Sequence, residues 1–259
     1  LMANPYADKK KVSANGILIA IGIIYGAIGT SPLYVMNAVF ADEIIQADVV
    51  RGTISAIFWT LTFQATLKYI VLTLRADNKG EGGIFSLYTL VRRTKFKWLI
   101  VPAIIGGSAL LADGLITPSI SISAALEGLK YYNPNFNTIP FIIGVLVILF
   151  FLQQFGSGIM WKPFGPIMSL WFLMLGVLGI LQIQHDWSVL ASLNPYYAYN
   201  LLITHPYGFT IFGAIFLCTT GAETLYSDMG HSNKKNIRIS WVYVKTMLVL
   251  NYFGQEAWL

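Results

Sequence analysis

The sequence predicts an all-α polytopic membrane protein, and three observations lead to this fold class. Of its 259 residues, 56% are hydrophobic and 11% are charged, whereas a soluble domain carries about 25% charged residues. The mean hydropathy is +0.63. The apolar residues gather in stretches that reach the roughly 20 residues needed to cross a bilayer. The composition therefore excludes an ordinary soluble domain.

Seven stretches are predicted to span the membrane as helices. They cover residues 15–40, 52–74, 98–129, 138–154, 164–184, 206–229 and 237–259. The basic start ADKKK precedes a long apolar run without a small-residue cleavage site, so we interpret that run as the first span rather than a secretory signal. The seventh stretch reaches the last residue without a closing polar loop. We therefore interpret residues 1–259 as an incomplete transmembrane domain.

The basic residues predict a cytoplasmic N-terminus. In that orientation thirteen Lys and Arg side chains fall on the cytoplasmic side, only Arg51 and Lys130 fall opposite, and Lys68 and Lys245 lie within spans. The positive-inside rule favours this arrangement. The net charge of +5 is therefore a topology signal, and nucleic acid is not an expected partner. The lone Cys218 excludes an intrachain disulfide, and no HExxH or GxSxG motif indicates an enzyme.

The loop between the second and third spans predicts a helix on the cytoplasmic surface. In RADNKGEGGIFSLYTLVRRTKFK, apolar side chains recur at i, i+3, i+4 and i+7, namely Ile84, Leu87, Tyr88 and Val91. We interpret GEGG as a tight turn before this helix. A phosphate-binding loop is disfavoured because no strand precedes it and no Lys-Ser/Thr pair follows.

Two of the predicted spans carry interruptions. The first contains Gly26, Gly29, Thr30, Ser31 and Pro32, and the sixth contains Thr219, Thr220 and Gly221 just before Glu223. If five spans form one repeat, the sixth corresponds to the first. Such paired breaks point to a midplane substrate site, where freed carbonyls, hydroxyls and helix ends can replace the hydration shell of a cation. A simple kink tolerated by neighbouring helices is the alternative.

Two acidic residues lie deep within predicted spans. A charge at the centre of a membrane helix costs about 2.5–3.5 kcal/mol on insertion scales, so Asp113 and Glu223 each need a purpose or a partner. Thr117 and Ser121 share a helix face with Asp113 if the helix persists through Pro118. Carboxyls that take up and release protons would suit a proton-coupled carrier. A structural hydrogen bond to a neighbouring helix is the alternative for each acid.

Other charged residues are given structural interpretations. Glu127 and Glu256 lie near the outer ends of their spans and are predicted to be interfacial. Lys245 is deeper and is predicted to snorkel to the cytoplasmic face or to pair with an acid. Asp228 and His231 follow the sixth span, where capping of the helix end is favoured over metal binding.

The motifs, taken in order, resemble one transporter family from end to end of the chain. They are YGAIGTSPLYV, LRADNKGEGGIFSLYTL, ADGLITPSISISAALEGL, PIMSLWF, LNPYYA, TTGAETLYSDMGH and LNYFGQEAW. Together they resemble the KUP/HAK/KT potassium uptake transporters. The resemblance implies the LeuT-like inverted-repeat fold of amino-acid/polyamine/organocation carriers, with the first repeat, the start of the second, and helices 1 and 6 broken. It also implies K⁺/H⁺ symport by alternating access across the plasma membrane, in a bacterial source.

The resemblance also assigns roles to individual residues. Tyr34, Thr117, Ser121 and Thr220 would offer oxygens to K⁺, and Asp113, Gly114 and Glu223 would handle protons or hold the polar network of the site. No cofactor is expected beyond the transported K⁺ and H⁺. A homodimer, and a regulatory nucleotide on a cytoplasmic C-terminal domain absent from this chain, are further expectations from the resemblance.

Two positions depart from the family pattern. The family reads Gly-Asp-Ile-Gly-Thr-Ser-Pro where this chain has Ala27, and it has a small residue where this chain has Glu256. A methyl group cannot neutralise a cation as a carboxylate does, so this form is expected to bind the ion less well. An engineered change, a paralogue with weaker binding and substitution by another acid remain open. A small-solute or amino-acid carrier of the same fold and a transport-inactive sensor are the alternative functions.

Overall fold

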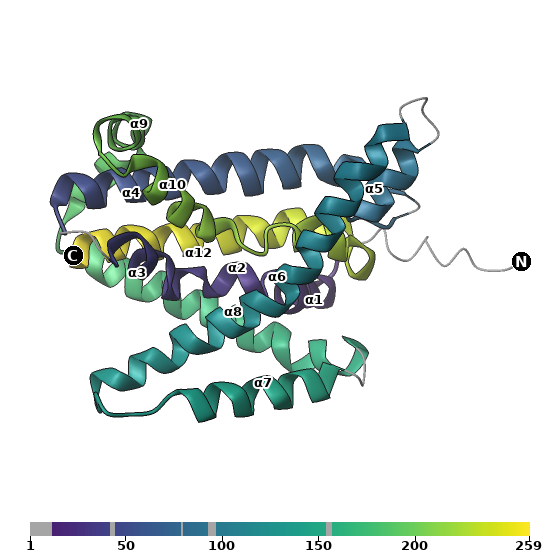
Figure 1. Cartoon of the computed structure of the whole chain (residues 1–259), viewed down its shortest axis with the longest axis horizontal. Coiled ribbons are helices and arrows are strands. Elements are labelled where there is room, and N and C mark those ends of the chain that lie inside the picture. Colours follow the sequence, from purple (N-terminus) through teal and green to yellow (C-terminus); the bar gives the residue numbers. More distant parts are fainter. Residues whose placement is uncertain (1–11, 42–44, 79, 93–96, 154–156) are drawn as a thin grey trace, which may run out of the picture.

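The computed structural model describes residues 12–41, 45–78, 80–92, 97–153 and 157–259. Lys9, Lys10, Lys11, Lys79, Arg93 and Lys95, on which part of the orientation argument depends, lie outside the described residues. The described chain is mostly helical (Figure 1). Its α-helices are α1 (Ala14–Ile24), α2 (Gly26–Thr30), α3 (Val35–Phe40), α4 (Ala47–Thr60), α5 (Ile84–Val91), α6 (Ile100–Glu127), α7 (Ile139–Gln153), α8 (Ser157–Ile183), α9 (Pro195–Thr204), α10 (Gly208–Phe216), α11 (Thr224–Ser227) and α12 (Lys234–Trp258).

Several helical segments can cross a membrane by length and composition. Within the described residues these are Ala47–Arg75, Lys97–Tyr131, Pro163–Ile183 and Gly208–Gly230, joined by a fifth if Ala14–Ile24 and Gly26–Leu33, bent by 64°, count as one span. The helix at Ile139–Leu152 is apolar but shorter. The structure is therefore compatible with a polytopic membrane protein.

The helix α12 buries several polar side chains. Asn236, Ser240 and Asn251 are buried along it, beside Trp241 and Tyr252. Other helices surround it: α12 packs against α8, α1 and α4. One face of the helix predicted as the seventh span therefore packs against protein, which explains how it can carry buried polar side chains.

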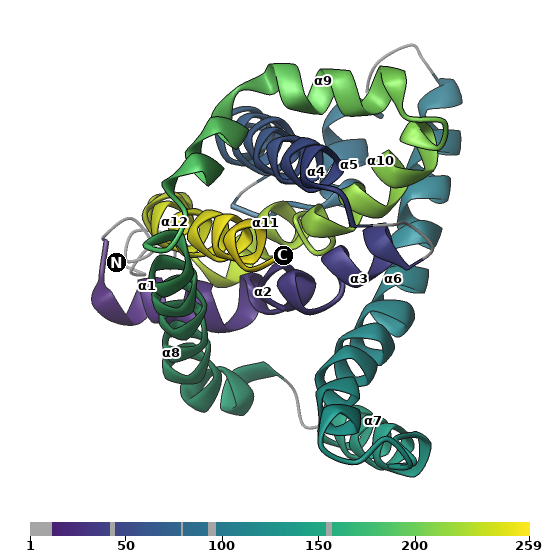
Figure 2. The same cartoon turned by 90° about the vertical axis from the view of Figure 1, so that its left-hand side faces the viewer.

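Small residues set how closely the helices approach. A β-carbon at Gly179 of α8 would lie 2.2 Å from the carbonyl oxygen of Leu250 on α12, and one at Gly22 of α1 would lie 2.5 Å from the backbone nitrogen of Gly165. Such contacts let helix backbones touch in a bilayer, where dispersion rather than water drives packing. By contrast, α6 and α7 extend away from the packed helices (Figure 2).

The helix predicted between the second and third spans is confirmed as α5. Gly80 and Gly83 before it adopt positive φ angles of 89° and 92°, which make the turn. However, α5 does not simply rest on a lipid surface. It packs on α6, where a β-carbon at Gly107 would lie 2.6 Å from the Phe85 ring.

Candidate functional site

The first interrupted segment separates α1 from α2 at Tyr25. Tyr25 has φ −98° and ψ 5°, outside the helical values, and a short 3₁₀ turn at Ser31–Leu33 follows α2. Side chains donate to five carbonyls of this segment: Thr224 Oγ1 to Ile24 O (2.6 Å), Thr30 Oγ1 to Ala27 O (2.8 Å), Ser31 Oγ to Ile28 O (2.8 Å), Trp171 Nε1 to Gly29 O (2.9 Å) and Gln255 Nε2 to Pro32 O (3.2 Å). These donors replace the helical hydrogen bonds that lipid could not supply.

The second interrupted segment follows α10 and touches the first. After a 3₁₀ turn at Leu217–Thr219, Thr220 is extended, with φ −56° and ψ 130°, and Gly221 has a φ of +84°. A β-carbon at Gly221 would lie only 2.4 Å from the β-carbon of Ala27. Because only glycine combines this backbone conformation with this contact, Gly221 brings the two interrupted segments together.

Hydroxyl groups from three spans converge beside this contact. Thr30 Oγ1 lies 2.8 Å from Ser121 Oγ of α6. The Tyr34 hydroxyl interacts with the hydroxyls of Thr30 and Thr220. Tyr34 is buried, and the other three are half-buried. The hydroxyl cluster, Thr30, Tyr34, Ser121 and Thr220, is therefore a shielded group of neutral oxygens.

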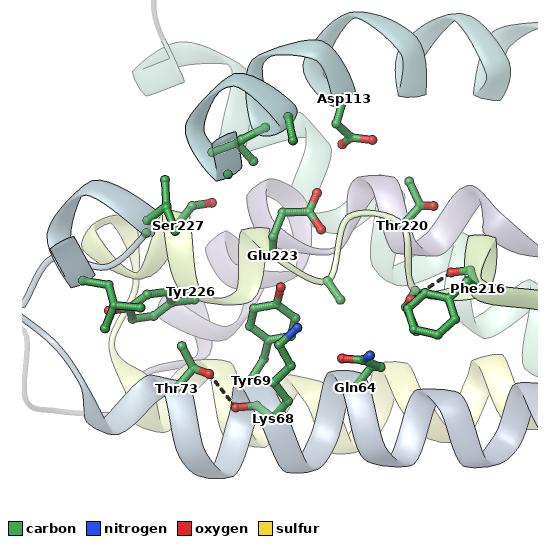
Figure 3. Close-up of a pocket in the computed structure, with 18 residues that line it drawn as sticks. Gln64, Lys68, Tyr69, Thr73, Asp113, Phe216, Thr220, Glu223, Tyr226 and Ser227 are labelled. Carbon is green, nitrogen blue, oxygen red and sulfur yellow. Dashed lines mark hydrogen bonds between the residues drawn. The ribbon is translucent and has the colours of Figure 1, made fainter. Parts of the chain in front are cut away.

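The two intramembrane acids lie next to the hydroxyl cluster. Asp113 accepts a hydrogen bond of 2.7 Å from Thr117 on the same helix face, and its charge acts on Glu223 of the sixth span. Figure 3 shows both carboxyl groups turned toward the same space. We call Asp113 and Glu223 the acid pair.

The acid pair lines a cavity of about 590 Å³. The walls come from the second span, α5, α6 and the end of the sixth span. The lining residues are Gln64, Lys68, Tyr69, Thr73, Gly83, Ile84, Leu87, Gly106, Ala109, Leu110, Asp113, Phe216, Thr219, Thr220, Ala222, Glu223, Tyr226 and Ser227. The cavity therefore connects the acid pair with the end of the molecule at which α5 lies.

The remaining residues predicted for the site lie outside the hydroxyl cluster, although Thr219 lines the cavity. Ser31 turns away from the hydroxyl cluster and lies 3.0 Å from the Tyr252 hydroxyl. A β-carbon at Gly29 would meet the ring of Phe172 at 2.7 Å, so Gly29 serves packing. Thr219 is buried and donates to Phe216 O at 2.9 Å. Gly114 is exposed, and no atom of another described element lies within 4 Å of where its β-carbon would be.

Sequence reasoning missed Gln64, Lys68 and Tyr69, which line the cavity from the second span. They belong to a π-helical stretch, Leu61–Leu72, that continues α4, and π-helical turns are frequent at functional sites. A signal was available, because a lysine within a predicted span is costly and marks a functional candidate.

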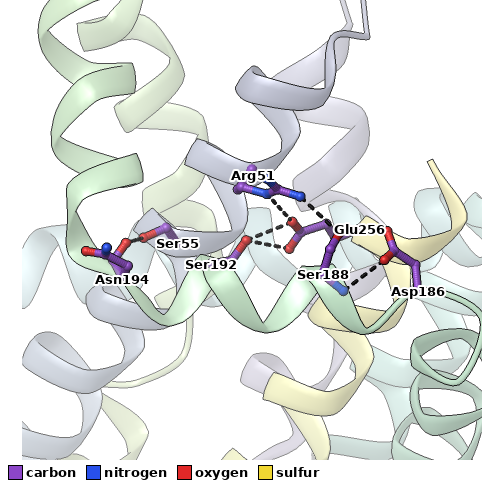
Figure 4. A network of polar contacts seen from close by, with 7 residues as sticks. All are labelled: Arg51, Ser55, Asp186, Ser188, Ser192, Asn194 and Glu256. Atoms are coloured by element: carbon purple, nitrogen blue, oxygen red, sulfur yellow. Dashed lines mark hydrogen bonds and ion pairs between the residues drawn. The ribbon is translucent and has the colours of Figure 1, made fainter.

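A polar network at the opposite end of the molecule contains Glu256 (Figure 4). Glu256 lies near the end of α12, and its side chain is only 6% exposed and pairs with Arg51 at 3.5 Å, a partner that the sequence did not predict. The Ser192 hydroxyl lies 2.8 and 2.7 Å from its two carboxylate oxygens. Nearby, the backbone N–H and the hydroxyl of Ser188 hydrogen-bond to Asp186, which lowers the pKa of that carboxyl.

Lys245 has a different partner from those predicted. Its ammonium donates to Thr62 Oγ1 at 3.0 Å and lies 5.6 Å from the centre of the Phe58 ring. A hydroxyl and an aromatic face thus stabilise this charge.

The segment before α5 docks on the end of the sixth span, beside the cavity. Lys234 Nζ lies 2.5 Å from Asp77 Oδ1, and this hydrogen bond holds the pKa of the Asp77 carboxyl below its usual range. The Tyr226 hydroxyl donates to Ala76 O. A β-carbon at Gly82 would overlap the Tyr226 carbonyl, so only glycine permits this contact.

Comparisons with known proteins identify relatives along nearly the whole chain. A family model described as the K⁺ potassium transporter integral membrane domain matches residues 14–259. The chain is 63% identical over 249 residues to the probable potassium transport system protein Kup of Flavobacterium psychrophilum. It is 61% identical over 252 residues to that of Flavobacterium johnsoniae, and 51% identical over 266 residues to that of Enterococcus faecalis.

These alignments cover 96%, 96% and 97% of this chain but only 38%, 38% and 40% of the three relatives. The chain therefore spans about two fifths of the length of the curated relatives it matches. No solved structure matches the chain.

Proposed function

The chain belongs to the family of K⁺ potassium transporter integral membrane domains, and on this premise we propose that the intact protein takes up potassium across the plasma membrane. The family is one of transporters rather than enzymes. The uptake proceeds by alternating access, with proton symport and a cytoplasmic N-terminus. The fold is the inverted repeat of LeuT-like carriers, of which this chain holds the first repeat and the start of the second.

The convergence of hydroxyls at the contact between the two interrupted segments is the observation that carries this proposal. The hydroxyl cluster draws oxygens from the first, third and sixth spans, and neutral oxygens can replace the hydration shell of K⁺. The proposed K⁺ ligands are Tyr34, Thr117, Ser121 and Thr220, joined by Thr30. Because the ligands lie on separate spans, a relative movement of these spans assembles or disperses the site.

The acid pair supports the proton-coupled part of the proposal. Asp113 and Glu223 lie beside the hydroxyl cluster and open to the cavity. When both carboxyls are ionised they repel each other, and a bound proton relieves that repulsion. A proton on the acid pair and a K⁺ ion on the hydroxyl cluster can therefore move through the same conformational change.

Rubidium uptake by the intact protein in liposomes tests the proposed function. We expect Tyr34→Phe and Thr220→Val to reduce uptake at least about tenfold, because each removes an oxygen that faces the cation. Thr246→Val is the matched control, since Thr246 is exposed on α12 and bonds only to its own helix, at Val242 O. Uptake that is unchanged in all three variants contradicts the assignment of the site.

A pH measurement inside the same vesicles tests the coupling. When K⁺ leaves the vesicles down its gradient, H⁺ should leave with it, so we expect the pH inside the vesicles to rise. We expect Glu223→Gln to abolish this signal. Potassium flux without an accompanying pH change would exclude symport. Competition of rubidium uptake by amino acids would favour the alternative small-solute carrier.

A further inference from the structure

Lys68 occupies the same cavity as the acid pair. Its side chain rises from the π-helical stretch beside Tyr69 and enters the space below Glu223 (Figure 3). Its ammonium lies 5.0 Å from the centre of the Tyr69 ring. The carboxyl of Glu223 lies close enough to the phenol of Tyr69 to interact with it electrostatically. An ammonium group and the acid pair thus line the same open cavity.

The ammonium of Lys68 has no carboxylate within salt-bridge distance among the described residues. It is held by a cation–π contact, which leaves the flexible four-carbon stem free to change rotamer. The cavity therefore contains a positively charged side chain that no salt bridge fixes to a single carboxylate.

The charges around Lys68 come from three elements. The titratable side chains that line the cavity are Lys68 and Tyr69 on the second span, Asp113 on α6, and Glu223 and Tyr226 on the sixth span. The Tyr226 hydroxyl already donates a hydrogen bond to Ala76 O. Lys68 is thus the one cation among the described lining residues, and the acid pair supplies the only carboxylates there.

We propose that Lys68 is a positioning residue for release: its tethered ammonium replaces the transported cations beside the acid pair and so expels them into the cavity. This inference rests on the proposed function. Like charges a few ångströms apart repel each other. An ammonium that swings toward Asp113 and Glu223 therefore disfavours a K⁺ ion bound beside them. The expulsion occurs toward the end of the molecule where α5 lies, which is the cytoplasmic end in the proposed orientation.

Inhibition of rubidium uptake by potassium inside the vesicles measures this release. In Lys68→Met we expect slower turnover, because the repelling charge is gone. For the same reason, the internal potassium concentration that inhibits uptake by half should be about tenfold lower than in wild type. Lys68→Arg retains the charge and should restore the wild-type inhibition. Lys245→Met is the matched control, because it removes an intramembrane lysine whose ammonium is bound to Thr62 outside this cavity. The same inhibition constant in wild type, Lys68→Met and Lys68→Arg overturns the inference.

A second measurement separates this inference from the proposed function. The melting temperature of the purified intact protein is measured at neutral pH for wild type, Lys68→Met, Glu223→Gln and the double variant. If Lys68 acts on the acid pair, Lys68→Met changes the melting temperature less in the Glu223→Gln background than in wild type. Additive effects overturn the inference, even if rubidium is transported. Coupled effects without rubidium transport would show that Lys68 acts on the acid pair but would contradict the proposed function, and with it the release of K⁺.

Discussion

At the scale of single residues, Ala27 lies at the contact between the two interrupted segments. A side chain at Gly221 would overlap the β-carbon of Ala27. The Ala27 carbonyl accepts the hydrogen bond from Thr30, a member of the hydroxyl cluster. Ala27 is only half-buried, so a larger side chain can keep the same β-carbon and extend toward the open side. The contact between the two interrupted segments therefore tolerates the aspartate that the family resemblance implies.

Ala27→Asp is expected to strengthen rubidium uptake. A carboxylate beside the hydroxyl cluster adds a full negative charge to neutral ligands, and we expect KM to fall about tenfold, which corresponds to roughly 1.4 kcal/mol. Ala27→Asn is the matched control, because it has the same shape without the charge. Uptake kinetics in liposomes measure the effect. If the Asp and Asn variants behave alike, charge at this position does not contribute to the site.

At the scale of elements, the interrupted sixth span depends on its backbone conformation. Gly221 has a positive φ, and its α-carbon faces the β-carbon of Ala27 and the backbone nitrogen of Ile28. The other glycine of the same span, Gly213, lies inside α10 and has open space around it among the described residues. The backbone conformation and packing therefore require glycine at position 221 but not at position 213.

Gly221→Ala should destabilise the protein and Gly213→Ala should not. A left-handed conformation costs an L-residue roughly 1–2 kcal/mol, to which the overlap with Ala27 adds. In a helix interior, alanine is favoured over glycine by roughly 0.5–1 kcal/mol. Thermal unfolding of the intact protein in detergent measures both variants. Equal melting temperatures would show that the two interrupted segments do not pack as described.

At the scale of the whole molecule, Glu256 joins parts of the chain that are far apart in sequence. Its carboxylate meets Arg51 of α4 and Ser192 of the 3₁₀ segment Trp187–Leu193. The two charges are unequally shielded, since the side chain of Glu256 is 6% exposed and that of Arg51 is 29% exposed. Arg51 also bonds to Ser188 at 3.1 Å and so has a second partner.

This difference in exposure predicts that substituting Arg51 and substituting Glu256 will lower the stability by different amounts. Arg51→Gln leaves a buried carboxylate unpaired and should cost about 1–3 kcal/mol of stability. Glu256→Gln leaves an arginine that keeps Ser188 and water, and it should cost less than about 1 kcal/mol. The double variant should be more stable than Arg51→Gln alone. Melting temperatures of the three variants decide the matter, and strictly additive losses would contradict a coupled pair.

Much of the fold could be predicted from local patterns. The apolar stretches, the amphipathic spacing of α5 and the four-residue separation of Asp113 and Thr117 are properties of a single helix, whose geometry is fixed by its own hydrogen bonds. Partners on other helices could not be predicted in this way. Glu256 was expected at an interface, and nothing within its own span indicates Arg51.

Hydrophobicity and local hydrogen bonding act along the chain, so the class of the protein, its helical segments and the residues that interrupt two of them can be predicted from the residue order. Which helix faces meet depends on packing between segments far apart in the chain. Close contacts such as that of Gly179 with Leu250 fix how each helix is placed against its neighbour. That placement sets Thr30 against Ser121 and puts Lys68 in the cavity of the acid pair.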